Sequence, residues 1–321
     1  MQFRFTRIVV LAVGIAVAAS GCGKYSINSI RALKAFKDGA GLYQKGAYRD
    51  AAPLFENAIA LNPDFGFSYF FLANSFDSMY KASHKGEAEN DALLPKAVEN
   101  YRKAIDKLAS SSEPQAAQFR KLSYEYLIAA YGSDKLDDFS QAEPLAKELI
   151  ALEPNEPSNY QALAKLYEDK GQYDEAEAMF RKATDVKPDD PAGYQLLAGY
   201  YNRQGQFDKT IDAFQRRAAM EPNNPEAWHT VGTYYYDKVL RDKSLAKDVA
   251  KKYVDAGLQS EDKALALNKD YYEAVTYKNL LIRLKALQEP QNAKQLLQEA
   301  DQLRDKALAL QKAQTGGGKK D

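Results

Sequence analysis

The side chains that most often carry enzyme chemistry are scarce in this chain of 321 residues. It holds one cysteine, Cys22, and two histidines, His84 and His229, which lie 145 residues apart. A cysteine nucleophile needs a nearby histidine, and a metal site needs several thiolate or imidazole ligands. One thiol also cannot form a disulfide within its own chain. These residues predict no cofactor and no metal site, so Cys22 must serve a local purpose.

Other catalytic motifs are weak or missing. The stretches 78–81 and 244–247 both fit the SxxK pattern of serine acyltransferases, but no companion motif accompanies either. The sequence has no GxxxxGK(S/T) phosphate loop, no HExxH and no GxSxG. Carboxylate pairs such as Glu168 and Asp169 are frequent, and on exposed helices they usually form a solvated face. We predict that the protein is not an enzyme.

Cys22 follows a segment with the order of a secretory signal peptide. Two arginines within the first seven residues precede an apolar run at 8–19. This run is shorter than the about 20 residues that cross a bilayer. The sequence Ala19-Ser20-Gly21-Cys22 resembles the lipobox of bacterial lipoproteins. The resemblance implies that residues 1–21 are removed and that Cys22 is lipidated, for example with palmitate; an ordinary signal peptide with a chance cysteine is the alternative.

The lipobox resemblance also implies a location. Several acyl chains would hold the protein firmly, whereas a single chain anchors only marginally. Gly23 stands after the cysteine, where enteric lipoproteins kept in the inner membrane carry Asp. The expected location is therefore the cell envelope, on the outer membrane facing the periplasm if the host has two membranes.

The charge balance narrows the class of partner. The chain has 44 Lys and Arg against 44 Asp and Glu, and 45% of its residues are hydrophobic. Nucleic-acid binding normally needs a basic excess, and disordered chains are poorer in apolar residues. We expect a folded, neutral body that does not bind nucleic acid.

The elements that must position any site repeat at an interval of 34 residues. Tyr160, Leu163 and Tyr167 have the i, i+3, i+7 spacing of one helix face, which indicates a buried stripe. The recurring positions are Pro154, Pro188 and Pro222; Tyr160, Tyr194 and Trp228; Leu163, Leu197 and Val231; Ala164, Ala198 and Gly232; and Tyr167, Tyr201 and Tyr235.

The repeating unit resembles the tetratricopeptide repeat, a helix-turn-helix of 34 residues. The resemblance implies an all-α fold, a right-handed superhelix of about six to seven repeats over residues 30–312. A lipidated tether at 22–29 would precede it, and a flexible tail at 313–321 would follow. Gly171 suits a turn that needs positive φ, and Pro188 suits the end of a second helix.

Three segments depart from the strict period. A polar insertion occupies 79–94, between the two helices of the second repeat. The stretch 238–252 is basic and could touch anionic lipid, although such a run is more often a soluble helix face. We predict a loop at 239–243, a long helix to about Leu267, and a last helical pair at 271–287 and 291–312.

The resemblance also predicts a binding groove, because the first helix of each pair lines the concave side in tetratricopeptide proteins. Tyr236 would be an aromatic anchor there and Arg203 a fork for carboxylates. No pair of groove positions has the Lys-then-Asn pattern that grips chaperone C-termini. The groove residues are Gln161, Lys165, Glu168 and Asp169 in the fourth repeat, Gln195, Asn202 and Arg203 in the fifth, and His229, Thr233, Tyr236 and Asp237 in the sixth.

These features predict an adaptor that holds segments of envelope proteins at a membrane surface, in envelope assembly or secretion. The alternative is a glycan-binding envelope lipoprotein that uses four aromatic residues outside the repeat pattern: Phe70, Phe71, Tyr234 and Tyr236. The identity of the partner and the oligomeric state do not follow from the sequence.

Overall fold

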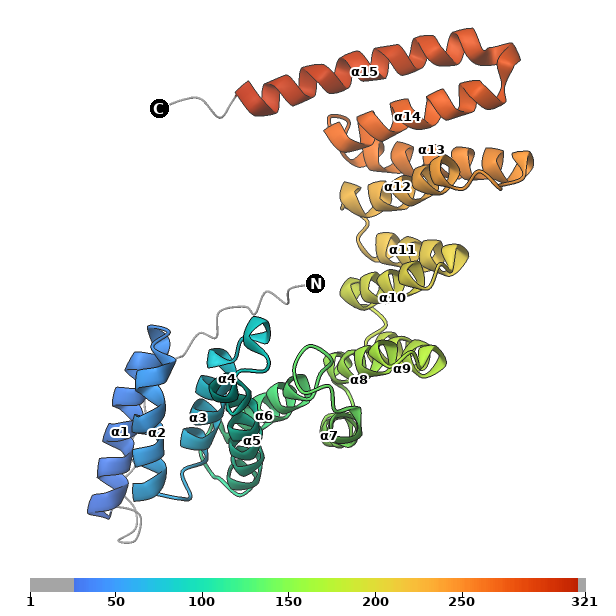
Figure 1. The fold of residues 1–321 in the computed structure, drawn as a ribbon. Coiled ribbons are helices and arrows are strands. Elements are labelled where there is room, and N and C mark those ends of the chain that lie inside the picture. The colour runs from blue at the N-terminus through green and yellow to red at the C-terminus, as the bar shows by residue number, and fades with distance from the viewer. Residues whose placement is uncertain (1–25, 317–321) are drawn as a thin grey trace. The chain divides into compact units, whose positions relative to one another are not determined.

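The computed structural model describes residues 26–316, and every regular element in that range is a helix (Figure 1). The chain divides into two compact units between Ala176 and Glu177, inside helix α9 (Tyr173–Val186). The all-α prediction is confirmed for the described residues, while the predicted right-handed twist of the array stays a prediction.

In the first unit, helices that follow one another in sequence pack together: α1 on α2, α3 on α5, and α6 on α7. Residues 82–91 form two short helices between α3 and α5. The elements are α1 (Ile27–Gln44), α2 (Tyr48–Leu61), α3 (Gly66–Met79), η1 (Ala82–His84), α4 (Ala88–Asp91), α5 (Leu93–Ala109), α6 (Ala116–Ala130), α7 (Phe139–Leu152) and α8 (Pro157–Asp169).

The second unit continues the pattern, with α10 on α11, α12 on α13, and α14 on α15. Together with α8 and α9, the described sequence makes seven consecutive helix-turn-helix repeats, the upper end of the prediction. The predicted loop at 239–243 lies slightly later, at 242–246, because α12 continues to Arg241. The elements are α10 (Pro191–Arg203), α11 (Phe207–Met220), α12 (Pro225–Arg241), α13 (Lys247–Leu267), α14 (Tyr272–Gln288), η2 (Pro290–Asn292) and α15 (Ala293–Gly316).

Local sequence signals explain where these helices begin and end. Gly171 and Gly205 have φ of 73° and 69°, which side chains other than glycine rarely adopt. Helices α9 and α11 end two residues before Pro188 and Pro222, as predicted. Helices α8, α10 and α12 each begin with a proline that follows a capping side chain: Glu156, Asp190 and Asn224.

The predicted stripe forms the core of both units. In the first unit, Tyr160, Leu163 and Tyr167 are buried. In the second, Tyr194, Leu197, Ala198 and Tyr201 are buried in the same way. Trp228 differs, because it is only half-buried and the ammonium of Lys263 lies 3.7 Å from its ring centroid.

Helix α3 is buried on nearly all sides, which suits its apolar sequence. Phe71 stacks on Phe55 at 5.7 Å, and Phe70 meets the edge of Phe119 at 4.9 Å. Phe70 is 0% exposed and Phe71 is 4% exposed. Neither ring can stack on a sugar, so two of the four aromatic residues proposed for glycan binding are core residues.

The insertion at 79–94 is folded around one amide side chain. Asn90 accepts a hydrogen bond of 2.9 Å from the backbone N–H of Lys81 and donates one of 3.1 Å to its carbonyl. Asp91 accepts a hydrogen bond from the backbone of Gly86, where φ is 100°. These contacts close the polar stretch into a compact loop that holds η1 and α4.

Candidate functional site

Four predicted groove residues lie on α8, in the first unit: Gln161, Lys165, Glu168 and Asp169. Lys165 pairs with Asp169 one turn further on, and its ammonium lies 3.8 Å from Glu168. Asp169 also accepts a hydrogen bond of 3.2 Å from Ser133. Because these charges are partly neutralised within the unit, this face of α8 is mixed polar.

The predicted residues on α10 and part of those on α12 lie at the surface of the second unit. Gln195, Asn202 and Arg203 are exposed on α10. On α12, the hydroxyl of Thr233 donates to the backbone oxygen of Thr230 at 2.7 Å. Asp237 lies 3.4 Å from the guanidinium of Arg241. The two predicted side chains on α12 therefore already have polar partners.

His229 requires a correction, because it is buried rather than open to the groove. The residue is 9% exposed. Its Nδ1 lies 3.1 and 3.0 Å from the two carboxylate oxygens of Glu261 on α13. The rings of Tyr271 and Tyr277 meet its ring edge-on, at 5.4 and 5.1 Å. The imidazole is therefore a buried group that contacts two tyrosine rings.

Glu261 occupies the place of a core aromatic residue. Phe55 and Phe214 each stand seven residues before the C-cap of a second helix, and Glu261 stands seven residues before Asn268, the C-cap of α13. Both phenylalanines are buried, and Glu261 is 0% exposed. A Cβ on Gly232 would lie 2.2 Å from the Glu261 carboxylate. Glycine on α12 thus makes room for the buried carboxylate.

The environment of Glu261 determines its protonation. Burial raises the pKa of its carboxyl to about 7, and the hydrogen bond from His229 opposes that rise. An unpaired charge at such a site would cost several kcal/mol, so the imidazole is needed as a partner. Glu261 has no access to solvent, and both of its carboxylate oxygens lie within hydrogen-bond distance of His229.

Aromatic residues of α12 and of α14 with its N-cap gather around this pair, and these two first helices lie in contact. Tyr236 meets Tyr277 edge-on at 5.4 Å, and Tyr277 and Tyr271 both contact His229. The three tyrosines are half-buried. We call His229, Tyr236, Tyr271 and Tyr277 the aromatic row. It combines three half-buried tyrosine rings with a buried imidazole.

The sequence predicted two residues of the aromatic row, His229 and Tyr236, and missed the other two. Tyr271 and Tyr277 lie on or beside the helix predicted at 271–287, but the interval between the C-caps Glu221 and Asn268 is 47 residues. This longer interval hid the alignment of α14 with α12. If positions are counted from the C-cap of each second helix, α14 aligns with α12. The same count places Glu261 at a core position.

A second polar cluster lies in the first unit, around the buried amide of Asn74 on α3. Tyr43 donates to the Asn74 side chain at 2.5 Å, and that side chain donates to the hydroxyl of Tyr101 at 3.0 Å. The pKa of Tyr101 is raised well above its ordinary value by burial. Asp77, three residues after Asn74, pairs with Lys135 at 2.5 Å. This network ties α1, α3 and α5 together.

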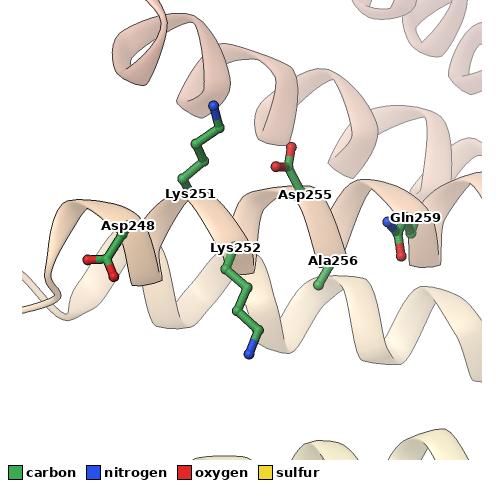
Figure 2. Close-up of a pocket in the computed structure, with 6 residues that line it drawn as sticks. All are labelled: Asp248, Lys251, Lys252, Asp255, Ala256 and Gln259. Atoms are coloured by element: carbon green, nitrogen blue, oxygen red, sulfur yellow. The ribbon is translucent and has the colours of Figure 1, made fainter.

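The basic stretch 238–252 has fewer unpaired charges than its sequence suggests. Lys238 pairs with Asp242 at 2.8 Å, and Lys251 pairs with Glu289 at 2.9 Å. A shallow cleft of about 520 Å³ lies on α13, where Lys251 and Asp255 extend to one side of the helix and Lys252 to the opposite side (Figure 2). Alternating charges line this cleft, so it lacks the single sign of charge that an anionic membrane surface would attract.

Another cleft, of about 490 Å³, lies where the insertion meets α2 and the end of α3. Its apolar part includes Phe76, Met79 and Leu93, and its rim includes Arg49 and Glu87. His84 on this rim lies 3.0 Å from Glu87. Acidic and basic side chains alternate here as well, and none of them is buried.

Cys22 lies outside the described residues. Among residues 26–316, no helix is long and apolar enough to cross a membrane. In the same range, His, Cys, Asp and Glu side chains do not gather in groups of three that could hold a metal ion.

Helix pairs that repeat along the chain define a helical repeat protein. Two models of the tetratricopeptide repeat match the chain, at residues 135–200 and 191–233. These matches show tetratricopeptide repeats over residues 135–233.

Solved structures similar to this chain include three proteins of named organisms. MamA from Desulfovibrio magneticus RS-1 is 15% identical, with a TM-score of 0.40 over 60% of this chain and 96% of that one. A repeat-containing protein from Cytophaga hutchinsonii is 14% identical, with a TM-score of 0.44 over 88% and 80%. A thermophilic protein from Thermus thermophilus is 19% identical, with a TM-score of 0.37 over 63% and 98%. A comparison with curated proteins gave no match.

Proposed function

We propose that this protein is an adaptor, anchored by lipid at an envelope membrane, that binds a segment of another envelope protein on its aromatic row. Tetratricopeptide repeats are generally scaffolds for protein interaction without chemistry of their own, and this chain has the repeat. The observation that carries the proposal is a set of three half-buried tyrosines. Tyr236 contacts Tyr277, and both Tyr277 and Tyr271, the N-cap of α14, contact His229.

Tyrosine is well suited to such a surface. Its ring supplies a large contact area at a small cost in side-chain entropy, and its hydroxyl supplies a hydrogen bond. Edge-on contacts at 5.1 to 5.4 Å restrain the rings of the aromatic row. A partner segment therefore meets a surface that is already ordered, which reduces the entropy lost on binding.

The anchor follows from the sequence. In this proposal Cys22 carries the acyl chains, and α1 begins at Ile27. Five residues reach at most about 18 Å when fully extended. A tether of this length keeps the first repeat near the membrane, so partners come to the membrane surface. Replacing Cys22 with Ser should move the protein from the membrane fraction to the soluble fraction.

The test is capture of partners by mild crosslinking of the membrane-bound protein. The double variant Tyr236→Ala/Tyr277→Ala should lose the proteins that the wild type captures. Tyr173→Ala, which removes a half-exposed tyrosine on α9, should retain them. Circular dichroism of each variant must show unchanged helix content. If the double variant captures the same proteins in the same amounts, the aromatic row is not the binding surface.

A further inference from the structure

The carboxylates around the aromatic row indicate which segment it would bind. Glu226 lies in the first turn of α12 and Glu273 in the first turn of α14. Both are exposed, and neither has an ion-pair partner among residues 26–316. The pKa of Tyr271 is raised by burial and then by three carboxylates, those of Glu273, Glu226 and Glu261. Glu226 lies three residues before His229 and Glu273 two residues after Tyr271, so both carboxylates stand at the helix ends that carry the aromatic row.

We infer that the aromatic row binds a positively charged peptide segment, with an arginine or lysine side chain over Tyr271 and Tyr277 between Glu226 and Glu273. This inference rests on the proposed function and names the chemistry of the partner. It is drawn from charge complementarity: electron-rich ring faces and unpaired carboxylates occur together at one place, in a chain whose overall charge is balanced.

Both components of this site favour a cation. A guanidinium or ammonium within about 6 Å of a tyrosine centroid is attracted by the ring quadrupole. Arginine should bind better than lysine, because its planar group stacks on rings and also donates two parallel hydrogen bonds to a carboxylate. An acidic segment would meet like charges at Glu226 and Glu273.

The two carboxylates also have an ordinary role. Acidic residues in the first turn of a helix interact favourably with its dipole, whatever binds nearby. That role affects stability alone. The inference is therefore tested by binding, with variants that change the same number of charges at other first turns and surfaces of the second unit.

The experiment uses the full-length protein in detergent and fluorescence anisotropy of labelled hexa-arginine, with hexa-lysine and hexa-glutamate for comparison. Hexa-arginine should bind most tightly, and hexa-glutamate should not bind. The variant Glu226→Gln/Glu273→Gln should bind hexa-arginine about 3- to 30-fold more weakly, since an exposed ion pair contributes up to about 1 kcal/mol. The variant Tyr271→Leu/Tyr277→Leu should also weaken binding, by about 3- to 10-fold.

The control is Asp248→Asn/Glu299→Gln, which removes two exposed charges from α13 and α15. It should bind hexa-arginine as the wild type does. Equal weakening by the control, or equal binding of hexa-glutamate, would overturn the inference. If the wild type binds hexa-arginine no better than hexa-glutamate while Tyr236→Ala/Tyr277→Ala still loses its captured partners, the charge inference fails and the proposed function stands.

Discussion

Glu261 lies where α2 and α11 place phenylalanine. Its contribution to stability changes with pH in the opposite sense to that of a carboxyl whose pKa is lowered on folding. Burial raises the pKa of Glu261 from the ordinary 4.5 to about 7. Between pH 4.5 and about pH 7, the carboxyl of Glu261 keeps its proton in the folded protein, whereas the unfolded chain has released it. The stabilisation that Glu261 contributes is therefore fully present below about pH 4.5. It is lost as the pH rises through about 7. From pH 5 to pH 8 the loss should be of order 2 to 3 kcal/mol.

The measurement is urea unfolding at pH 5 and pH 8, followed by the fluorescence of Trp228, the one tryptophan of the chain. Trp228 precedes His229 and so reports on the repeat that holds Glu261. The variant Glu261→Gln should lose most of the difference between the two pH values. Carboxyls with lowered pKa, such as Glu143 and Glu177, titrate below this range in both proteins. Identical pH dependence in wild type and variant would contradict the prediction.

At the scale of the element, Gly232 on α12 leaves the space that a side chain of α13 fills. Ala164 and Ala198 occupy the position that Gly232 occupies in the sixth repeat. A Cβ there would lie 2.2 Å from the Glu261 carboxylate, which is buried and hydrogen-bonded to His229. Gly232→Ala should therefore cost about 1 to 3 kcal/mol, as overpacking of a core does.

The matched control for that substitution is Gly199→Ala on α10. A Cβ at Gly199 would lie 3.5 Å from Nη1 of Arg203, an ordinary contact. Because alanine favours the helix over glycine by about 1 kcal/mol, this variant should be as stable as the wild type or slightly more stable. Thermal unfolding of the two variants, followed by circular dichroism, checks both expectations. A Gly232→Ala variant with unchanged unfolding would show that α13 can move away from α12.

The elements that the sequence predicted well are those with a local signal. Turn glycines such as Gly171 and Gly205, and prolines just beyond helix ends, depend only on backbone geometry, so their 34-residue spacing predicted α8 to α12. The fold of 79–94 was not predictable in this way, because Asn90 closes it by bonding to Lys81, nine residues earlier. The burial of His229 also escaped prediction, since its partner Glu261 comes from another helix.

At the scale of the whole molecule, each repeat buries its apolar face only against its neighbours, so damage to one repeat should stay local. Tyr201 on α10 is 5% exposed, and its hydroxyl donates to Glu177 at 3.0 Å. Its pKa is raised to about 12, first by burial. Tyr201→Ala should cost about 3 to 5 kcal/mol, as truncation of a buried aromatic residue does. Backbone amides of α10 and α11 should then exchange hydrogen faster.

The measurement is hydrogen exchange followed by mass spectrometry of peptides from each helix, with Asn202→Ala as the control at the neighbouring exposed position. Exchange in α1 to α3 should be unchanged in Tyr201→Ala, because these helices belong to the other compact unit. If exchange accelerates equally in α1 to α3 and in α10 to α11, the array unfolds as one cooperative body and the nearest-neighbour description is wrong. If hydrogen exchange accelerates only in α10 and α11, stabilisation by a partner should also stay local. A partner bound on the aromatic row should then protect chiefly α12 to α14, because binding stabilises the repeats that it contacts.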